Sequence, residues 1–145
     1  MKRGHDLEPT IRAQYAALFG VQANPACGYD EEYPWLKVSL DGWVPELKLA
    51  IEFKAVNKDD HKLALEGKLT RKYEVQCDHH YLVSQATQLH YVSYNPNFAV
   101  SERLAVVKYP RQEETISQLF VMEREFWQRL QESRYKLGEN SHFTP

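Results

Sequence analysis

Apolar and polar residues alternate without a break over one short segment of the chain, from Leu47 to Lys54. A period of two is typical of a β-strand, because successive side chains of a strand point to opposite faces of the sheet. One face would carry Leu47, Leu49, Ile51 and Phe53, and the other would carry Lys48, Ala50, Glu52 and Lys54. The segment from Leu36 to Asp41 alternates too.

A turn at Gly42–Glu46 would join these two segments into a β-hairpin over about residues 36–55. The hairpin would bring Asp41 near Glu52. The segment before it, Asn24–Pro34, is rich in Pro, Gly and acidic residues and is predicted to be a loop.

A helical pattern comes earlier in the chain, over residues 7–19. Asp6 is the expected N-cap, Pro9 is compatible with a first turn, and Gly20 is a typical residue for the end of a helix. The apolar stripe of this helix would consist of Leu7, Ile11, Tyr15 and Leu18.

The rest of the chain alternates between helical and extended patterns. One short helix is expected within Asn57–Gly67, and the longer elements are a helix over about 69–85, strands over about 89–94 and 104–109, and a helix over about 111–136. The last helix would bury Ile116, Leu119, Phe120, Phe126, Trp127 and Leu130. This order predicts an α/β or α+β sandwich with a central sheet, in a single domain over residues 1–145.

Composition narrows the class of protein without deciding its function. Hydrophobic residues make up 43% and charged residues 26% of the chain, which is typical of a soluble globular domain. The formal net charge of -2 predicts no polyanionic partner by itself. The two cysteines, Cys27 and Cys77, form neither a zinc motif nor a disulfide framework, so a reducing cytoplasm is expected. No apolar run has the length of a membrane span, and no membrane partner is expected.

Glu52 and Lys54 project from the same face of the predicted strand, and Asp41 would lie beside them. Two carboxylates and a lysine suit a hydrolase that uses Mg²⁺, since this ion prefers oxygen ligands and can activate a bound water. The alternative is an exposed strand face, where Glu and Lys are common.

Basic residues follow the hairpin closely. They are Lys54, Lys58, His61, Lys62, Lys68, Arg71 and Lys72. Such a cluster would contact a phosphate backbone, or it is a solvated segment, since Asp59, Asp60 and Glu66 are interleaved with it. His79 and His80 are adjacent on a predicted helix and would point about 100° apart, so they are not expected to share a metal. Tyr73, Gln76 and His80 would fall on one face of that helix.

Several of these segments, in order, resemble the lambda-exonuclease-like (YqaJ viral recombinase) branch of the PD-(D/E)xK nucleases. Arg3–Pro9 is similar to the Gly-x-x-x-Glu entry of its first core helix, and Glu32–Gly42 to its segment ending Ser-Pro-Asp-Gly, with Leu40 in place of Pro. Glu52-Phe53-Lys54 matches its Glu-x-Lys, Tyr73–Gln76 its Tyr-x-x-Gln, and Tyr91–Pro96 its Tyr-Asp-Pro strand end. The resemblance implies an α/β (α+β) fold with a restriction-endonuclease-like core, a central mixed β-sheet flanked by helices.

The resemblance also implies a role for each matching residue. Asp41, Glu52 and the backbone carbonyl of Phe53 would hold Mg²⁺ (or Mn²⁺), as one or two ions. Glu8 would bind a metal or its water, Lys54 would activate the attacking water, and Gln76 would orient Lys54 or the scissile phosphate. Contacts to DNA are expected from Lys58, Lys62, Lys68, Arg71, Lys72 and Tyr73.

The implied function is a 5′-to-3′ double-strand DNA exonuclease of phage-type recombination, encoded by a phage or prophage and active in the bacterial cytoplasm. DNA, a single-strand annealing protein and further copies of the chain are the implied partners. A nicking or structure-directed endonuclease is the first alternative, and a non-catalytic DNA- or protein-binding module is the second. Members of the family usually carry an additional region before the first helix, whereas three residues precede Gly4 here, so a minimal nuclease and part of a longer protein are both open.

Overall fold

A computed structural model describes residues 2–141 of the chain, and the side chains of residues 6–134. Its elements, in order, are α1 (Lys2–Phe19), β1 (Asn24–Tyr29), β2 (Lys37–Val44), the 3₁₀ turn η1 (Pro45–Leu47), β3 (Leu49–Ala55), α2 (Lys58–Leu65), α3 (Arg71–Ser84), β4 (Gln88–Tyr94), the 3₁₀ turn η2 (Val100–Glu102), β5 (Leu104–Tyr109) and α4 (Glu113–Ser141). Met1 and residues 142–145 of the predicted domain lie outside this description.

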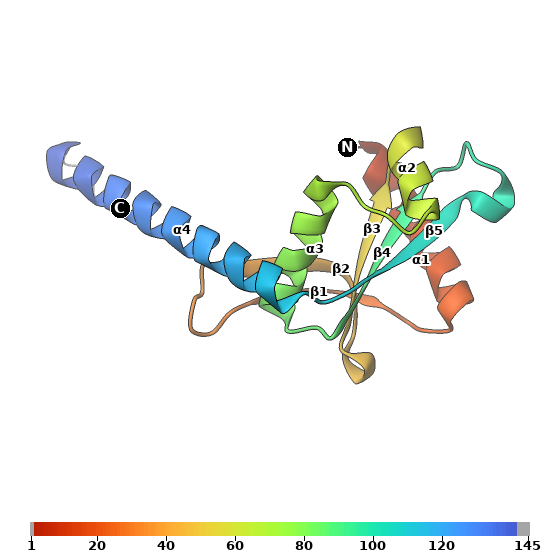
Figure 1. The fold of residues 1–145 in the computed structure, drawn as a ribbon, viewed down its shortest axis with the longest axis horizontal. Helices are drawn as coiled ribbons and strands as arrows, with labels where there is room; N and C mark the ends of the chain where they lie inside the picture. Colours follow the sequence, from red (N-terminus) through yellow and green to blue (C-terminus); the bar gives the residue numbers. More distant parts are fainter. Residues whose placement is uncertain (1, 142–145) are drawn as a thin grey trace.

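The strands form one five-stranded sheet in the order β1-β2-β3-β4-β5 (Figure 1). β3 and β4 are parallel, and the other neighbouring pairs are antiparallel. The parallel pair requires a crossover connection, which α2 and α3 provide. The predicted mixed sheet flanked by helices is therefore confirmed. Among the residues described, no helix is long and apolar enough to cross a membrane.

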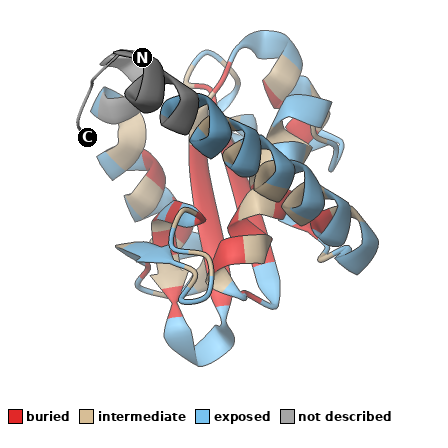
Figure 2. Ribbon diagram, turned by 90° about the vertical axis from the view of Figure 1, so that its left-hand side faces the viewer, coloured by how far each residue is buried: buried red, intermediate tan, exposed pale blue. Residues whose placement is uncertain are grey.

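β3 lies in the middle of the sheet and is buried on both faces (Figure 2). Leu49, Ile51 and Phe53 belong to a core that includes Ile11 and Tyr15 of α1. Ala50 belongs to a separate core on the other face, which contains residues of α3 and α4. The predicted division of this strand into two faces is thus confirmed from Leu49 on, whereas Leu47 lies in η1, 45% exposed, and Lys48 follows η1 in a left-handed conformation.

The first helix differs from its prediction at both ends. α1 begins at Lys2, so Asp6 is no N-cap and Pro9 lies inside the helix. The proline ring fits helical φ, but inside a helix it removes one backbone hydrogen bond and crowds the carbonyl four residues earlier. Leu18 is 64% exposed, and Phe19 packs instead, with its ring stacked 4.7 Å from that of Tyr15. Gly20 ends the helix at φ +65°, as expected.

The segment Asn24–Pro34 was predicted to be a loop, and this is wrong for its first half. β1 pairs with β2 along Asn24–Tyr29 as the edge strand of the sheet. Most of its side chains are exposed, so the strand is held by backbone pairing and shows no apolar alternation. Beyond it, the Asp30 carboxylate accepts backbone N–H bonds from Glu32 and Tyr33, which makes this acidic segment a turn.

The predicted hairpin exists, but its turn lies later in the chain. β2 continues through Val44, and η1 with Lys48 at φ +47° makes the reversal. Gly42 is a strand residue, and a Cβ atom there would lie 2.9 Å from the Cβ of Ala23 and 3.2 Å from that of Ile51. The glycine therefore serves close packing between β2 and its neighbours and does not form the turn.

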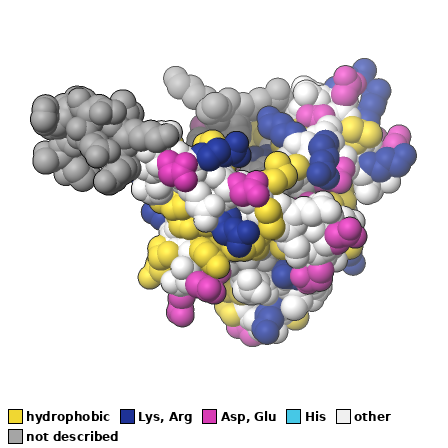
Figure 3. Space-filling model, turned by 60° about the vertical axis from the view of Figure 1, so that its left-hand side comes forward, with side chains coloured by type: hydrophobic (Ala, Val, Ile, Leu, Met, Phe, Trp, Pro, Cys, Tyr) yellow, Lys and Arg dark blue, Asp and Glu magenta, His cyan; other side chains and the backbone are white. Residues whose placement is uncertain are grey.

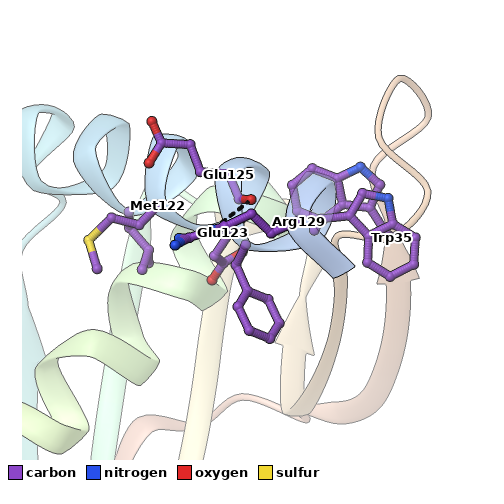
Figure 4. Close-up of a pocket in the computed structure, with 8 residues that line it drawn as sticks. Trp35, Met122, Glu123, Glu125 and Arg129 are labelled. Carbon is purple, nitrogen blue, oxygen red and sulfur yellow. Dashed lines mark hydrogen bonds between the residues drawn. The ribbon is translucent and has the colours of Figure 1, made fainter. Parts of the chain in front are cut away.

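The buried stripe predicted for the last helix is confirmed in part, since Leu119, Phe120, Trp127 and Leu130 are half-buried. Ile116 is buried, but Phe126 is 64% exposed, because α4 extends away from the sheet (Figure 1). Hydrophobic side chains are grouped on the face where α4 leaves the body (Figure 3). A groove of about 520 Å³ runs along the helix (Figure 4), where Trp35 stacks on Trp127 with 5.9 Å between the ring centroids.

Candidate metal centre

The hairpin places Asp41 of β2 beside Glu52 of β3, as predicted. Gly42 pairs with Ile51, which puts the preceding residue of β2 next to Glu52. On the other edge of β2, Asn24 pairs with Trp43 and Ala26 with Leu40, so Asp41 and Gly42 lie opposite a single residue of β1. This is a β-bulge, a feature that commonly redirects a side chain beside a functional site. The Phe53 N–H fixes the carboxylate by donating to Asp41 Oδ2 at 2.8 Å.

The two carboxylates have opposite pKa shifts. Burial raises the pKa of Asp41 from 3.8 to about 7, the negative charges of Glu52 and Glu8 add to this, and the Phe53 hydrogen bond opposes it. Burial would also raise the pKa of Glu52, but the His80 hydrogen bond and the electrostatic effect of His80 and Lys54 hold it below its usual range. Glu52 is therefore held in its ionised form, whereas the site favours the protonated form of Asp41, and a bound cation would shift Asp41 toward the carboxylate.

Glu52 is 5% exposed, and each of its oxygens has its own partners. Oε1 lies 3.2 Å from Lys54 Nζ and accepts a hydrogen bond from Gln76 Nε2 at 3.2 Å. Oε2 is 2.9 Å from His80 Nε2. Glu52 belongs to β3, and Gln76 and His80 lie one turn apart on α3. The helix therefore holds the carboxylate through two hydrogen bonds. Sequence reasoning assigned no role to His80, although its shared helix face with Gln76 was visible.

Glu8 approaches from α1 but is held by Arg12. Arg12 Nη2 lies 3.1 Å from Glu8 Oε1 and donates to the Asp41 carbonyl at 2.7 Å, and its guanidinium stands 5.0 Å from the Phe53 ring centroid. Arg12 thus connects Glu8 to the β2 bulge, a link that sequence reasoning missed although Arg12 follows Glu8 by one helical turn. Within the described part of the chain, no three His, Cys, Asp or Glu side chains are close enough to hold a metal together. The carboxylates gathered at the site are therefore the Asp41–Glu52 pair, and the backbone carbonyl of Phe53 follows Glu52 directly in the chain.

The predicted DNA-contacting lysines and Arg71 are exposed on α2 and around the start of α3, whereas Tyr73 is half-buried and packs against the core. Lys58 and Lys62 lie on α2, while Lys72 Nζ stands 5.5 Å from the Tyr73 ring centroid and Lys54 Nζ 5.9 Å from it. Two of the cations face acids: Lys68 is 3.6 Å from Glu66, and Arg71 is 3.9 Å from Glu74. Their contact with DNA stays a prediction.

His61 does not belong to that basic surface. Its side chain is buried, and its ring nitrogens bond the Ser93 hydroxyl and the Glu102 carbonyl, each at 2.7 Å. This histidine ties α2 to β4 and to the η2 turn, so the inclusion of His61 among the basic side chains facing solvent was wrong.

The adjacent histidines of α3 diverge, as expected. His79 Nδ1 bonds Glu123 of α4 at 2.7 Å, and its Nε2 bonds the Lys37 carbonyl at 2.7 Å. His79 therefore ties α3 to α4 and β2, whereas His80 bonds Glu52.

The sheet order, with a carboxylate pair on the central hairpin and a lysine two residues after the second carboxylate, defines the PD-(D/E)xK nuclease fold. A family model, the YqaJ-like viral recombinase domain, matches residues 1–87. This chain belongs to the YqaJ-like viral recombinase domain family. Among proteins with curated descriptions, none matches the sequence significantly.

Solved structures show the same fold. The alkaline exonuclease LHK-Exo of Laribacter hongkongensis is 22% identical, with a TM-score of 0.90 over 98% of this chain and 74% of that one. LHK-Exo in complex with dAMP is 21% identical, with a TM-score of 0.84 over 98% and 73% of the two chains. A phage-related exonuclease from Haemophilus somnus 129PT is 16% identical, with a TM-score of 0.64 over 81% and 64%.

Proposed function

We propose that this protein is a divalent-metal-dependent deoxyribonuclease that degrades duplex DNA from an end, in the 5′-to-3′ direction, during phage-type recombination. The observation that carries the proposal is the Asp41–Glu52 pair, with the Lys54 ammonium 3.2 Å from Glu52. The chain is also similar in structure to LHK-Exo, an alkaline exonuclease whose complex with dAMP has been solved. This similarity supports the reaction class.

The donor set fits Mg²⁺ or Mn²⁺. Both ions accept hard oxygen ligands, and Mg²⁺ is commonly held by one or two carboxylates together with water and substrate phosphate. Burial, with the charges of Glu52 and Glu8, raises the pKa of Asp41, and a bound cation would favour its ionised form, which supports the proposal. Such an ion supplies polarisation of a phosphoryl oxygen and activation of a bound water. A second ion would recruit Glu8, which must then leave Arg12.

The side chains around the pair have complementary roles in this proposal. Lys54 is 30% exposed, so its ammonium can meet an incoming phosphate and neutralise charge that develops in the transition state. Gln76 donates to Glu52 Oε1, the oxygen that also contacts Lys54. This hydrogen bond keeps the carboxylate in position beside the lysine. The exposed lysines of α2, with Arg71, Lys72 and Tyr73, would guide the phosphate backbone toward the hairpin.

Degradation of one strand leaves a single strand, which an annealing protein would receive in the cytoplasm of the bacterial host. Association of the chain with further copies of itself would hold the enzyme on its substrate.

The deciding test compares 5′-phosphorylated linear duplex with covalently closed circles in Mg²⁺ or Mn²⁺, with Lys54→Ala as the control. Loss of the linear duplex alone, abolished in Lys54→Ala, is the expected result. Products from a 5′-labelled and a 3′-labelled strand give the direction. Nicking of the circle would replace the exonuclease by an endonuclease, and folded protein that cuts neither substrate would indicate a binding module.

A further inference from the structure

His80 belongs to no motif of the proposed nuclease, yet it contacts the centre of the site directly. Its Nε2 lies 2.9 Å from Glu52 Oε2, and its side chain is 7% exposed. Because interactions with Lys54 and His80 favour the ionised form of Glu52, the carboxylate accepts and the imidazole Nε2–H donates.

The other ring nitrogen of His80 shows that this residue is no ordinary structural link. Nδ1 is buried and has no hydrogen-bond partner among the described residues. An unpartnered buried polar atom destabilises a fold and calls for an explanation. His79, its neighbour in sequence, uses both ring nitrogens to join α3 to α4 and β2. Glu52 is thus the only hydrogen-bond partner of the His80 side chain in the described structure.

His80 and Gln76 each donate a hydrogen bond to a different oxygen of the Glu52 carboxylate. Gln76 donates to Oε1 at 3.2 Å and His80 to Oε2 at 2.9 Å. Two donors separated by one helical turn fix the plane of the carboxylate as well as its position. Lys54 Nζ also lies 3.2 Å from Oε1, so His80 is the one side chain with a described hydrogen bond to Oε2.

We propose that His80 is a positioning residue that fixes the Glu52 carboxylate for a divalent cation, an inference that rests on the proposed metal-dependent nuclease. Residues that orient a metal ligand typically change metal affinity about 10- to 100-fold when they are replaced. His80 therefore sets the affinity of the site without touching the cation itself.

The test measures Mn²⁺ binding by calorimetry for the full chain and four variants, each checked for folding by thermal unfolding. His80→Leu keeps bulk and removes the donor, and it is expected to raise the Kd at least about tenfold. His80→Gln places an amide N–H near the position of Nε2 and should stay within about threefold of the parent, whereas His80→Asn, whose amide ends nearer Nδ1, should not. His79→Leu is the matched control and should leave the Kd unchanged.

A second readout separates positioning from general damage. Raising the Mn²⁺ concentration should restore most of the nuclease rate of His80→Leu, whereas Lys54→Ala should stay inactive. The inference is overturned if folded His80→Leu binds Mn²⁺ like the parent, or, should that variant not fold, if the Gln and Asn variants bind equally. In both cases the proposed nuclease stands. A parent chain that binds no Mn²⁺ would overturn the inference and the proposed metal centre together.

Discussion

Replacement of Asp41 by Asn should stabilise the metal-free protein and remove most of the stabilisation that a bound metal gives. In the metal-free protein, burial and the charges of Glu52 and Glu8 raise the pKa of Asp41 from 3.8 to about 7. Folding therefore favours the protonated carboxyl, and ionising it destabilises the fold. Asn cannot ionise, and its amide oxygen can still accept the Phe53 N–H that now reaches Asp41 at 2.8 Å.

The magnitude follows from linkage. Each pKa unit corresponds to about 1.4 kcal/mol, so the shift of Asp41 sets a ceiling of roughly 4 kcal/mol on the penalty above pH 7. The penalty is absent below pH 3.8, grows as the pH rises toward 7, and is complete above it. Since relaxation and entering water offset part of it, Asp41→Asn should stabilise the metal-free protein by about 1–3 kcal/mol at pH 8 and by little at pH 4.5.

The assay is urea unfolding at pH 4.5 and pH 8, in EDTA and in Mn²⁺. Metal at about 100 times its Kd should stabilise the parent by about 2.7 kcal/mol, and it should leave the variant almost unchanged. The reasoning fails if the variant is less stable than the parent in EDTA at pH 8, or if Mn²⁺ stabilises both proteins equally. Because unfolding is measured, the result does not depend on finding the right DNA substrate.

Three further predictions follow from packing and charge. Gly42→Ala should destabilise the fold by about 1–3 kcal/mol because its Cβ meets Ala23 and Ile51, whereas Gly28→Ala, with no atom within 4 Å, should be nearly neutral in the same thermal unfolding assay. The hydrogen bond to Glu123 raises the pKa of His79, and burial opposes this shift. The stabilisation that protonated His79 gives is therefore complete below pH 6.5 and is lost as the pH rises through the raised pKa. His79→Gln should accordingly destabilise more at pH 5.5 than at pH 8.5, and an equal loss at both would contradict this. Arg12→Leu should weaken Mn²⁺ binding by freeing the β2 bulge, and tighter binding would show that Arg12 instead competes with the cation for Glu8.

The central strand was predictable because its pattern is local. Alternation along β3 reports both cores, since each face of the strand is buried against a different layer. The approach of Asp41 to Glu52 followed from a hairpin, in which closeness in sequence becomes closeness in space. The turn itself was misplaced because Gly42 was interpreted as a turn former, whereas its function is close packing against Ile51.

The errors concern elements whose stability comes from elsewhere in the fold. β1 is held by backbone pairing with β2 and exposes most of its side chains, so no apolar pattern marks it. α4 has an apolar stripe at helical spacing, but this spacing does not show how far along the helix the rest of the protein covers it. Phe126 is exposed for this reason. His80 and Arg12 act on residues 28 and 29 positions away, which local spacing does not reveal.

The crossover topology explains why these distant contacts meet at one place. A parallel β3–β4 pair requires a connection that crosses one face of the sheet, and α3, the second helix of that connection, lies over β3. Residues one turn apart on α3 then reach the two oxygens of Glu52, while α1 reaches Asp41 from the opposite side through Arg12. The fold thus holds two carboxylates together against their repulsion, at the expense of stability in the metal-free state. A cation bound between Asp41 and Glu52, as proposed, would offset this cost, because it would favour the ionised form of both carboxylates.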